Sequence, residues 1–548
     1  MSKIKIFSLG GLNEKGKNMY VIEVDKDIFV FDAGSKYAEG HLLGIDYVIP
    51  DLSYLKENVD RVKGIFITHP HDEHIGALPN VINELPNVKI YGTMFTIDTI
   101  KRTLEEINIP TTNIVEISPH KKIVFGENSI FPISLTHSVP ESVGYVLNTK
   151  DGAIFYTGNF VFDSTMRGYY KTDIGKLAYV GKQGVLCLLS ESLYSGRKGY
   201  TSPNHRLSSL INEMLIRKEE RIIFHVISTN IYRLQELFNE VLKTQRKIVI
   251  MGKKLQKIIN YVLEKGYVKF DKSRIGDLTN INDRDVLILT SSDNDKPFVN
   301  IEKILSGYDK FITVKPTDTF IFLEPISDDL EKSAVKITDK IAKIGPDVII
   351  LSTDKYLSHH ASSEDLMLML DLINPKYYFP VIGEYRHQVE NADIASIIGI
   401  PKDNILLKEN GDVITFENGN LIDKFEKVKV GNIMIDGIST EDVGELVIKD
   451  REMLSDNGIV IISSTLDKKT KQLLAGPEII TRGFIYVKES SDMIKEIGEI
   501  SLKILNENIS NNYVDYNNVK NSIREEVGRY LYMETETRPM IITVMQEI

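Results

Sequence analysis

The amino-acid sequence predicts an α/β protein of several domains, and three observations lead to that fold class. Residues 4–31 alternate short apolar strands with glycine turns. From about Asn204 the pattern changes to helices that alternate with buried strands, which is typical of a parallel sheet. The chain has 548 residues, too many for one hydrophobic core, so about three domains are expected.

The N-terminal strands are predicted at Ile4–Leu9, Met19–Val24 and Ile28–Phe31. Their period-two alternation between turn signals favours β-hairpins that form one half of a sandwich. Helical spacing follows over residues 75–85, where Pro79 is tolerable only in the first turn. Four further strands are expected at Lys89–Tyr91, Ile130–Leu135, Gly144–Leu147 and Ala153–Tyr156.

The rest of the chain is predicted to alternate between helix and strand. Helices are expected at Ser208–Arg217, Arg233–Leu242, Lys332–Ile344 and Asp365–Leu372. Strands are expected at Arg221–Ile227, Lys247–Met251, Leu287–Leu289, Phe320–Leu323 and Tyr377–Pro380. A last unit begins at about Gly458 with a strand and continues with helices Asp492–Asn506 and Val519–Tyr530 and a closing strand Met540–Met545.

Composition and charge limit the class of protein. Apolar residues make up 42% and charged residues 26% of the chain, which is ordinary for a globular protein. No uncharged apolar run reaches about 18 residues and the N-terminus lacks a signal-peptide core, so a cytoplasmic protein without a membrane segment is expected. The net charge of −11 argues against general nucleic-acid binding but allows a local basic groove. Cys187, the single cysteine, lies in an apolar run and is expected to be a buried thiol, which excludes disulfides and cysteine zinc sites.

The densest chemical signal is the segment Thr68-His-Pro-His-Asp-Glu-His74, directly after the apolar strand Ile65–Ile67. Neutral imidazoles in this spacing can converge on one cation, because alternate residues of an extended segment share a face. The alternative is a polar loop with chance histidines. Only 11 histidines occur in the 548 residues, so three of them within six positions favour a metal site.

Several segments resemble ribonuclease J, a bacterial RNA-processing family with a metallo-β-lactamase domain and an inserted β-CASP domain. In chain order they are Gly10–Tyr20, Thr68–Gly76, Thr136–Pro140, Tyr156–Phe160, Gly383–Arg386 and Gly476–Phe484. The resemblance implies an αββα sandwich of the metallo-β-lactamase type, an inserted β-CASP α/β domain and a small C-terminal α+β domain. The expected boundaries are 1–203 and 353–430 for the two parts of the sandwich domain, 204–352 for β-CASP, 431–457 for a linker and 458–548 for the C-terminal domain.

In the family, two zinc or manganese ions activate a water that attacks the scissile phosphate of RNA. Two cations suit this reaction because they stabilise both the attacking and the leaving oxygen. Carried over by resemblance, the first metal takes His69, His71 and His137, and all three positions match.

The second metal site does not match as well. By resemblance it takes Glu73, where the family has aspartate, together with His74. A family histidine is replaced by Ile382, and the aspartate that bridges both metals is replaced by Asn159. Losing the bridging anion exposes two dications, roughly 3.5–4 Å apart, to their mutual repulsion. At most one strongly bound zinc or manganese ion is therefore expected.

The resemblance also implies residues for single-stranded RNA. Ser228, Asn230 and Arg233 match a phosphate-binding segment, although Arg233 could instead be a solvated residue in a first helical turn. Ser358 and His360 are retained from a family motif, and in active relatives that histidine contacts the phosphate and assists catalysis.

Glu73, Glu191 and His360 are the candidate catalytic residues. Glu191 matches an acidic family residue, although a buried structural acid would explain it equally well. The loop Thr290–Pro297 differs from the family's phosphate-approaching loop and lacks both of its glycines.

Two function hypotheses follow. The first is a metal-dependent ribonuclease with attenuated activity, working 5′→3′ and internally, which the retained histidines favour. The second is an inactive RNA-binding or structural subunit, which Asn159 and Ile382 favour; it would form a homodimer or a heteromer with an active ribonuclease J. Hydrolysis of a small molecule is a third and weaker hypothesis, because an insertion and a tail of this kind suit polymer substrates.

Overall fold

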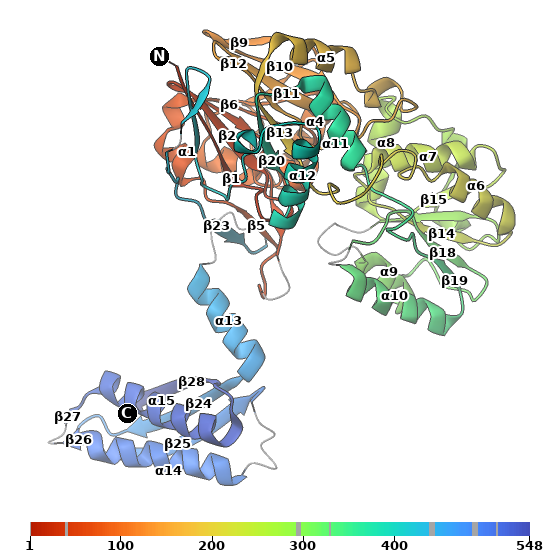
Figure 1. Ribbon diagram of the computed structural model, residues 1–548. Coiled ribbons are helices and arrows are strands. Elements are labelled where there is room, and N and C mark those ends of the chain that lie inside the picture. Colours follow the sequence, from red (N-terminus) through yellow and green to blue (C-terminus); the bar gives the residue numbers. More distant parts are fainter. Residues whose placement is uncertain are drawn as a thin grey trace. The chain divides into compact units, whose positions relative to one another are not determined.

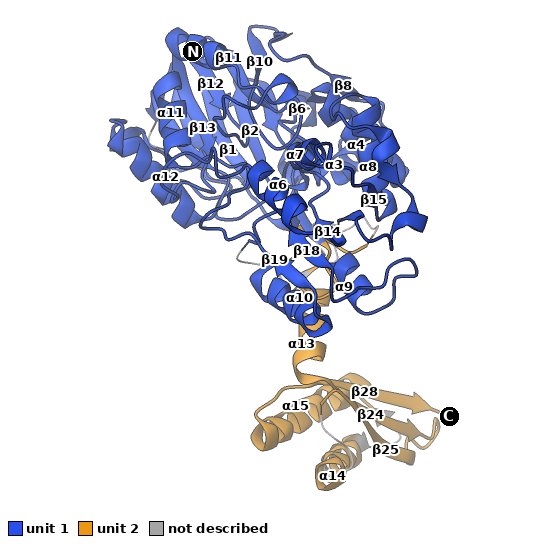
Figure 2. Cartoon of the chain, turned by 90° about the vertical axis from the view of Figure 1, so that its right-hand side faces the viewer, with its two compact units in different colours: residues 1–37, 47–432 blue, residues 38–46, 433–548 orange. Residues whose placement is uncertain are grey.

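The computed structural model describes residues 2–38, 42–291, 298–327, 330–422, 424–437, 444–484, 491–510 and 513–548. Two compact units emerge, one of residues 1–37 and 47–432 and one of residues 38–46 and 433–548 (Figure 2). Within the described residues, no helix has the length and apolar character needed to cross a membrane. Helices and strands are labelled in Figure 1.

The first sheet of the larger unit has the strand order β22-β21-β1-β2-β3-β6-β7-β8. Its N-terminal strands pair antiparallel, whereas β6 joins β3 in parallel. β2 is buried at every position because both faces of the sheet are covered. The strands are β1 Lys3–Gly10, β2 Met19–Val24, β3 Asp27–Phe31, β6 Val62–Phe66, β7 Ile90–Gly92, β8 Ile114–Glu116, β21 Ile414–Glu417 and β22 Asn420–Ile422.

The second sheet packs against the first and has the order β20-β13-β12-β11-β10-β9. An apolar core fills the space between the two sheets and includes Tyr20, Phe31, Tyr145 and Phe379. β20 pairs in parallel with β13, so a segment late in the chain completes a sheet begun much earlier. The strands are β9 Ile123–Phe125, β10 Asn128–Ser134, β11 Val143–Thr149, β12 Gly152–Tyr156, β13 Val185–Glu191 and β20 Tyr377–Val381.

Helices cover the outer faces of this sandwich. A separate core joins the second sheet to α5 and α11, and includes Leu177, Leu188, Leu366 and Tyr378. Figure 1 shows α11 and α12 beside this sheet. The helices of the sandwich part are α1 Ser53–Glu57, α2 Asp72–Ile75, α3 Leu78–Glu84, α4 Met94–Glu106, α5 Ile174–Gln183, α11 Ser363–Ile373 and α12 Tyr385–Ile397.

The third sheet has the order β16-β15-β17-β14-β18-β19, and every pairing in it is parallel. One apolar core lies toward α6, α7 and α8 and another toward α9 and α10, so both faces are covered. Its strands are β14 Ile222–His225, β15 Ile248–Ile250, β16 Ile275–Gly276, β17 Leu287–Thr290, β18 Thr319–Phe322 and β19 Asp347–Ile349. Its helices are α6 Ser208–Arg217, α7 Ile231–Val241, α8 Lys253–Glu264, α9 Val299–Leu305 and α10 Glu331–Ile344.

The smaller unit contains a sheet of order β25-β24-β28 with α14 and α15 on one face. Buried and partly exposed residues alternate along β24, as expected for a strand with one covered face. Its elements include α13 Glu445–Asn457, β24 Ile459–Leu466, β25 Leu473–Arg482, α14 Ser491–Asn508, the short pair β26 Ile509–Ser510 and β27 Tyr513–Val514, α15 Tyr516–Thr535 and β28 Met540–Glu547.

The structure confirms the α/β class, the N-terminal hairpins and the parallel sheet, but two expectations were wrong in detail. Residues 75–85 are not one helix: α2 ends at Ile75, and α3 then begins at Leu78 with Pro79 in its first turn. Residues 431–457 are not a plain connector, because they include α13 and the strand β23 Asn432–Ile435. Cys187 is buried, as expected.

Candidate metal centre

The histidine-rich loop is positioned by the end of β6 and by a buried acid on the neighbouring strand. Asp32 follows β3, which pairs in parallel with β6, so both strand ends lie at the same edge of the sheet. The Thr68 backbone N–H donates to Asp32 Oδ1 at 2.8 Å, and the Thr68 hydroxyl donates to the same carboxylate at 3.0 Å. The loop that carries His69 and His71 is thereby fixed before α2 begins.

Three histidines converge at this edge. Ligand atoms of His69, His71 and His137 all lie within 4.8 Å of one another. His137 follows β10, and its Nδ1–H donates to the His359 carbonyl oxygen at 2.8 Å, which leaves Nε2 toward the other histidines. His137 Nε2 lies 3.3 Å from His71 Nδ1.

The electrostatics of this cluster suit a cation. Burial lowers the pKa of His69, His71 and His137, and the neighbouring imidazoles lower the values for His69 and His137 further. The three imidazoles are therefore neutral at neutral pH and carry free lone pairs. His69 Nε2 is buried without a hydrogen-bond partner among the described residues. Three neutral imidazoles with an orphaned ring nitrogen fit one divalent metal ion, and the sequence-predicted first ligand set is thus brought together.

The candidate second site has a different character. His74 is fully buried, and its Nδ1 lies 2.7 Å from Asp32 Oδ2. Burial lowers the pKa of His74, but the Asp32 carboxylate outweighs it and the net pKa is raised. Tyr156 also donates to Asp32 Oδ2, at 2.7 Å. Asp32 therefore orients the His74 ring by accepting its Nδ1–H. Histidines that bind metals commonly donate their second ring N–H to a carboxylate in this way.

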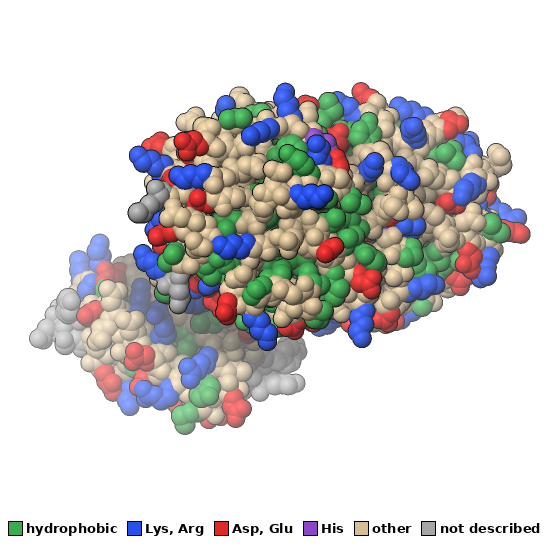
Figure 3. Space-filling view, turned by 45° about the horizontal axis from the view of Figure 1, so that its top comes forward, with side chains coloured by type: hydrophobic (Ala, Val, Ile, Leu, Met, Phe, Trp, Pro, Cys, Tyr) green, Lys and Arg blue, Asp and Glu red, His purple; other side chains and the backbone are tan. Residues whose placement is uncertain are grey.

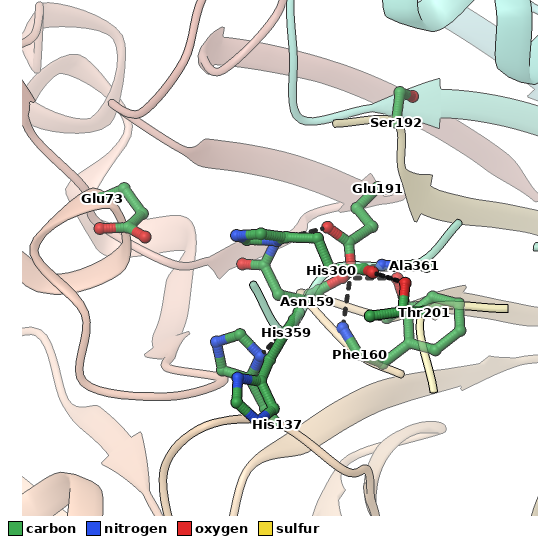
Figure 4. Close-up of polar contacts among 12 residues, drawn as sticks. Glu73, His137, Asn159, Phe160, Glu191, Ser192, Thr201, His359, His360 and Ala361 are labelled. Carbon is green, nitrogen blue, oxygen red and sulfur yellow. Dashed lines mark hydrogen bonds and ion pairs between the residues drawn. The ribbon is translucent and has the colours of Figure 1, made fainter. Parts of the chain in front are cut away.

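Glu73 lies at the more exposed side of the three-histidine cluster, beside His71. Its side chain is 37% exposed, and its Oε1 lies 3.7 Å from His71 Nδ1. Figure 4 shows Glu73 on the left, apart from the residues around Glu191. Among the described residues, the group able to hold a metal consists of the three histidines without a carboxylate.

Asn159 is held by the buried acid Glu191 (Figure 4). Asn159 Nδ2 donates to Glu191 Oε2 at 2.8 Å, which orients the amide, and its Oδ1 is buried. Glu191 also accepts the backbone N–H of Phe160 at 2.7 Å and of Ala361 at 3.2 Å. His360 Nδ1 lies 2.9 Å from Glu191 Oε2. Glu191 thus connects the loop that carries Asn159 with the loop that carries His360.

Ile382 follows β20 and takes a backbone conformation that is unusual for its side chain. Its φ is +55°, in the left-handed region that β-branched residues rarely adopt. The Tyr20 hydroxyl accepts the Ile382 N–H at 3.1 Å, and the Ile382 carbonyl accepts the Ser192 N–H at 3.0 Å. The side chain is buried in the core between the two sheets and offers no ligand atom.

The candidate RNA-binding residues form two groups, one that follows β14 and one that precedes α11. Ser228 and Asn230 are buried, and Asn230 caps α7 by accepting the Arg233 N–H at 3.0 Å. The Arg233 side chain is fully buried and pairs with Glu236 and Glu324, so the alternative of a solvated first-turn residue is wrong. Ser358 and His360 precede α11 near the histidine cluster, with the His137 and His360 ring centroids 5.8 Å apart. Residues 292–297 of the altered loop lie outside the described residues.

Sequence reasoning did not find two residues of this centre. Asp32 directly follows the predicted strand Ile28–Phe31, and the available signal was a charged residue at the end of a buried strand. His359 is buried, both of its ring nitrogens have no partner among the described residues, and its ring lies 6.3 Å from that of His137. The only sequence signal for His359 was its position next to His360.

The sandwich of two sheets with a histidine cluster at its edge defines a metallo-β-lactamase fold, and the insertion defines the β-CASP group. Residues 12–167 match the model of the metallo-beta-lactamase superfamily, residues 219–341 that of the ribonuclease J beta-CASP domain, and residues 446–548 that of the ribonuclease J C-terminal domain. These matches confirm the predicted architecture.

Full-length relatives make the assignment more specific. The chain is 38% identical to "Ribonuclease J2" of Bacillus subtilis (strain 168) over 549 residues, covering 100% of this chain and 99% of the relative. It is 33% identical to "Ribonuclease J 2" of Staphylococcus aureus (strain NCTC 8325), covering 100% and 98%. The chain belongs to the ribonuclease J family. A crystal structure of a protein of unknown function from Enterococcus faecalis V583 shares the fold, with a TM-score of 0.54 and 15% identity over 76% of this chain and 100% of that one.

Proposed function

We propose that the chain is a cytoplasmic ribonuclease J-type subunit that hydrolyses RNA phosphodiesters with a divalent metal and with attenuated turnover. One observation carries this proposal: the three-histidine cluster of His69, His71 and His137 is complete, whereas Asn159 and Ile382 offer no charged or imidazole ligand. One strongly bound zinc or manganese ion is the expected content. The names of the full-length relatives support RNA as the substrate.

The loss of one carboxylate explains why the second ion should bind weakly. Asn159 presents a neutral amide oxygen where a carboxylate would screen two dications from each other. Glu73 is partly exposed and remains the only carboxylate offered as a ligand by resemblance. A site for one ion retains water activation but loses the second cation that would stabilise the leaving oxygen, so turnover should fall.

The chain's own residues would then position RNA. His360 is partly exposed while its Nδ1 is engaged by Glu191, so Nε2 is the atom suited to a phosphate contact. Glu191 orients the His360 ring and the Asn159 amide through one carboxylate oxygen. A bound divalent ion supplies Lewis acidity and lowers the pKa of water.

A second candidate function is an inactive RNA-binding or structural partner of an active ribonuclease J. Ile382 favours it, because its apolar side chain replaces a ligand and is part of the core. The exposed side of the C-terminal sheet also favours it, since Ile480 is 37% and Ile542 is 40% exposed there. Single-stranded RNA and a second ribonuclease J chain are the partners proposed.

The test combines metal analysis with RNA degradation by the purified full-length chain. We expect about one equivalent of zinc or manganese and slow, metal-dependent cleavage that His69→Ala abolishes, because the first ligand set is then broken. Glu526→Gln, an exposed helix residue paired with Arg529, is the control for preparation effects. Two tightly bound ions would contradict the one-ion proposal. Cleavage seen only with an active ribonuclease J present, and unaffected by His69→Ala, would favour the structural alternative.

A further inference from the structure

The strands β14 and β18 are neighbours in the parallel sheet, so the segments that follow them meet at one edge. Asn230 and Arg233 come from the segment after β14, and Glu324 comes directly after β18. Ligands of parallel sheets bind in crevices outside the carboxyl ends of such strands. Here that place is taken by a side chain of the protein itself.

Two donors converge on one oxygen of Glu324. Asn230 Nδ2 donates to Glu324 Oε1 at 2.6 Å, and Arg233 Nε donates to the same oxygen at 3.3 Å. Arg233 Nη2 is buried and has no hydrogen-bond partner in the described part of the chain. An amide, a guanidinium and an orphaned N–H around a carboxylate form the donor set of an anion site.

Two acidic side chains, Glu236 and Glu324, surround the single guanidinium of Arg233. Arg233 Nη1 is paired with Glu236, which also accepts the Leu207 N–H at 3.1 Å. Glu236 therefore suffices as the counter-charge of the buried guanidinium, and Glu324 adds a second carboxylate. Burial raises the pKa of Glu324 by more than the Arg233 guanidinium and the Asn230 amide lower it. The guanidinium thus faces two acidic side chains, and Glu324 engages the donors that an incoming phosphate would need.

The cluster lies close to the candidate metal centre. The N–H of Tyr232, next to Arg233, donates to the carbonyl oxygen of Ser138 at 2.9 Å, and Ser138 follows the candidate ligand His137. The ring centroids of His137 and His360 are 5.8 Å apart. A terminal phosphate bound at Asn230 and Arg233 would thus be near the residues proposed to hold the scissile phosphate.

We infer that Glu324 is a built-in anion that occupies the phosphate-binding end of the site formed by Asn230 and Arg233, so that this chain binds RNA without preference for a 5′-monophosphate. Glu324 is then a specificity-determining residue: it replaces the ligand's terminal phosphate with a carboxylate of the protein. The choice of RNA as ligand rests on the proposed function, but the occupation of the anion site does not.

The experiment compares two single-stranded RNAs of the same sequence, one with a 5′-monophosphate and one with a 5′-hydroxyl, both labelled at the 3′ end. Fluorescence anisotropy with the full-length wild type should give affinities equal within about twofold. Glu324→Ala vacates the place of the carboxylate and leaves Arg233 paired with Glu236, so it should favour the 5′-monophosphate by about tenfold or more, as expected for one charge-assisted hydrogen bond gained.

Glu240→Ala is the matched control, because Glu240 is also a buried acid of this domain, paired with a cation, Lys243, and an amide, Asn212. It should leave the ratio of affinities unchanged. A wild type that already prefers the 5′-monophosphate, or a Glu324→Ala variant whose ratio stays at one while it binds RNA, would overturn the inference.

A second measurement separates this inference from the proposed function. Thermal unfolding is followed with adenosine 5′-monophosphate and with adenosine, because a ligand that binds only the folded state raises its melting temperature. The monophosphate alone should stabilise Glu324→Ala and should not stabilise wild type or Glu240→Ala. If no variant binds either RNA but Glu324→Ala responds to the monophosphate, the proposed function fails and the inference stands. If Glu324→Ala responds to neither RNA nor monophosphate, Glu324 is only a structural ion-pair partner and the inference is wrong.

Discussion

At the scale of single residues, Ile382 combines an unfavourable backbone conformation with the loss of a ligand. A non-glycine residue in the left-handed region costs about 1–3 kcal/mol, and β-branched side chains are among the least suited to it. Histidine, asparagine and aspartate occur there more readily. The backbone at Ile382 therefore keeps a conformation that suits a polar ligand, and its hydrogen bonds to Tyr20 and Ser192 hold it in place.

This geometry makes repair of the second site a direct test. Asn159→Asp with Ile382→His restores one carboxylate and one imidazole, and the left-handed backbone should accept histidine without added strain. We expect the metal content to rise from about one toward two equivalents, measured by mass spectrometry of the metal after dialysis. Activity should rise less, since the 290–297 loop also differs from the family.

The control for this repair is the pair Asn148→Asp and Ile216→His, an amide on β11 and an exposed apolar residue on α6, away from the centre. It should leave the metal content unchanged. If the repaired chain binds no more metal than the parent, the position of the loops rather than the identity of the ligands limits the second ion.

Much of the site followed from residue types at known spacings. His69, His71 and His137 were predicted by the H-x-H-x-x-H segment and by resemblance, and their ligand atoms do converge. The burial of Arg233 was not predictable from its own helix: Glu236 is a local i,i+3 partner on α7, but Glu324 is 91 residues away and meets Arg233 only in the folded domain. The same holds for Asp32, whose partner His74 is 42 positions distant.

At the scale of elements, the segment after β12 is tied to the segment that leads into α6 by one buried acid. Asp163 accepts from Arg206 Nε at 2.8 Å and Nη2 at 2.7 Å, and its Oδ2 lies 3.0 Å from His205 Nε2. Burial alone would raise the pKa of Asp163, but the hydrogen bonds from His205, Arg206 and Thr165 lower it well below its usual range.

Asp163→Asn should therefore destabilise the chain at neutral pH by about 2–4 kcal/mol, because it removes a carboxylate that neutralises buried partners. The folded pKa lies below the unfolded value of about 4, so this contribution is fully present above pH 4 and is lost as pH falls below it. Urea unfolding should show a large difference between wild type and Asp163→Asn at pH 7 and a smaller one at pH 3.5. A difference that does not change with pH would contradict the assigned charge of Asp163.

Elements with strong periodicity were predicted well, and weakly marked ones were not. Helix Ser208–Arg217 has the bounds expected, and β14, β15, β17 and β18 lie within a residue or two of their predictions, whereas the short strands β16 and β19 were not predicted. α8, Lys253–Glu264, was missed although it is amphipathic, because it follows a short buried strand and begins without an acidic or hydroxyl cap. The strand β25 was missed because residues on it are largely exposed and include Gly476 and Pro477.

At the scale of the whole molecule, charge is distributed rather than concentrated. In the space-filling view of Figure 3, Lys and Arg side chains are interspersed with Asp and Glu side chains, and little histidine reaches the face drawn. This agrees with the burial of His69, His74 and His137. With a net charge of −11 and mixed surface charge, long-range attraction of RNA is weak, so binding must rely on local contacts and should be sensitive to salt.

The smaller unit offers an apolar surface on the face of its sheet opposite α14 and α15. Ile461 lies directly across from Ile480 on β25 and from Ile542 on β28, so three isoleucines form one row over three strands. Ile480 is 37% and Ile542 is 40% exposed. Rows of cross-strand apolar side chains that remain exposed are typical of association surfaces.

We therefore expect the full-length chain to associate through this row, with itself or with an active ribonuclease J, and to lose association when the row is charged. Ile480→Asp with Ile542→Lys should shift the mass measured by light scattering to that of a monomer, as should truncation after Asn457, while the helical circular dichroism of the double variant stays unchanged. Ile216→Asp, at a side chain that is 73% exposed on α6, is the control for a charge placed on an isolated exposed isoleucine and should leave the mass as it is. An oligomer that survives truncation after Asn457 would place the contact on the larger unit. A full-length chain that is monomeric alone and remains so when mixed with an active ribonuclease J would refute the association altogether.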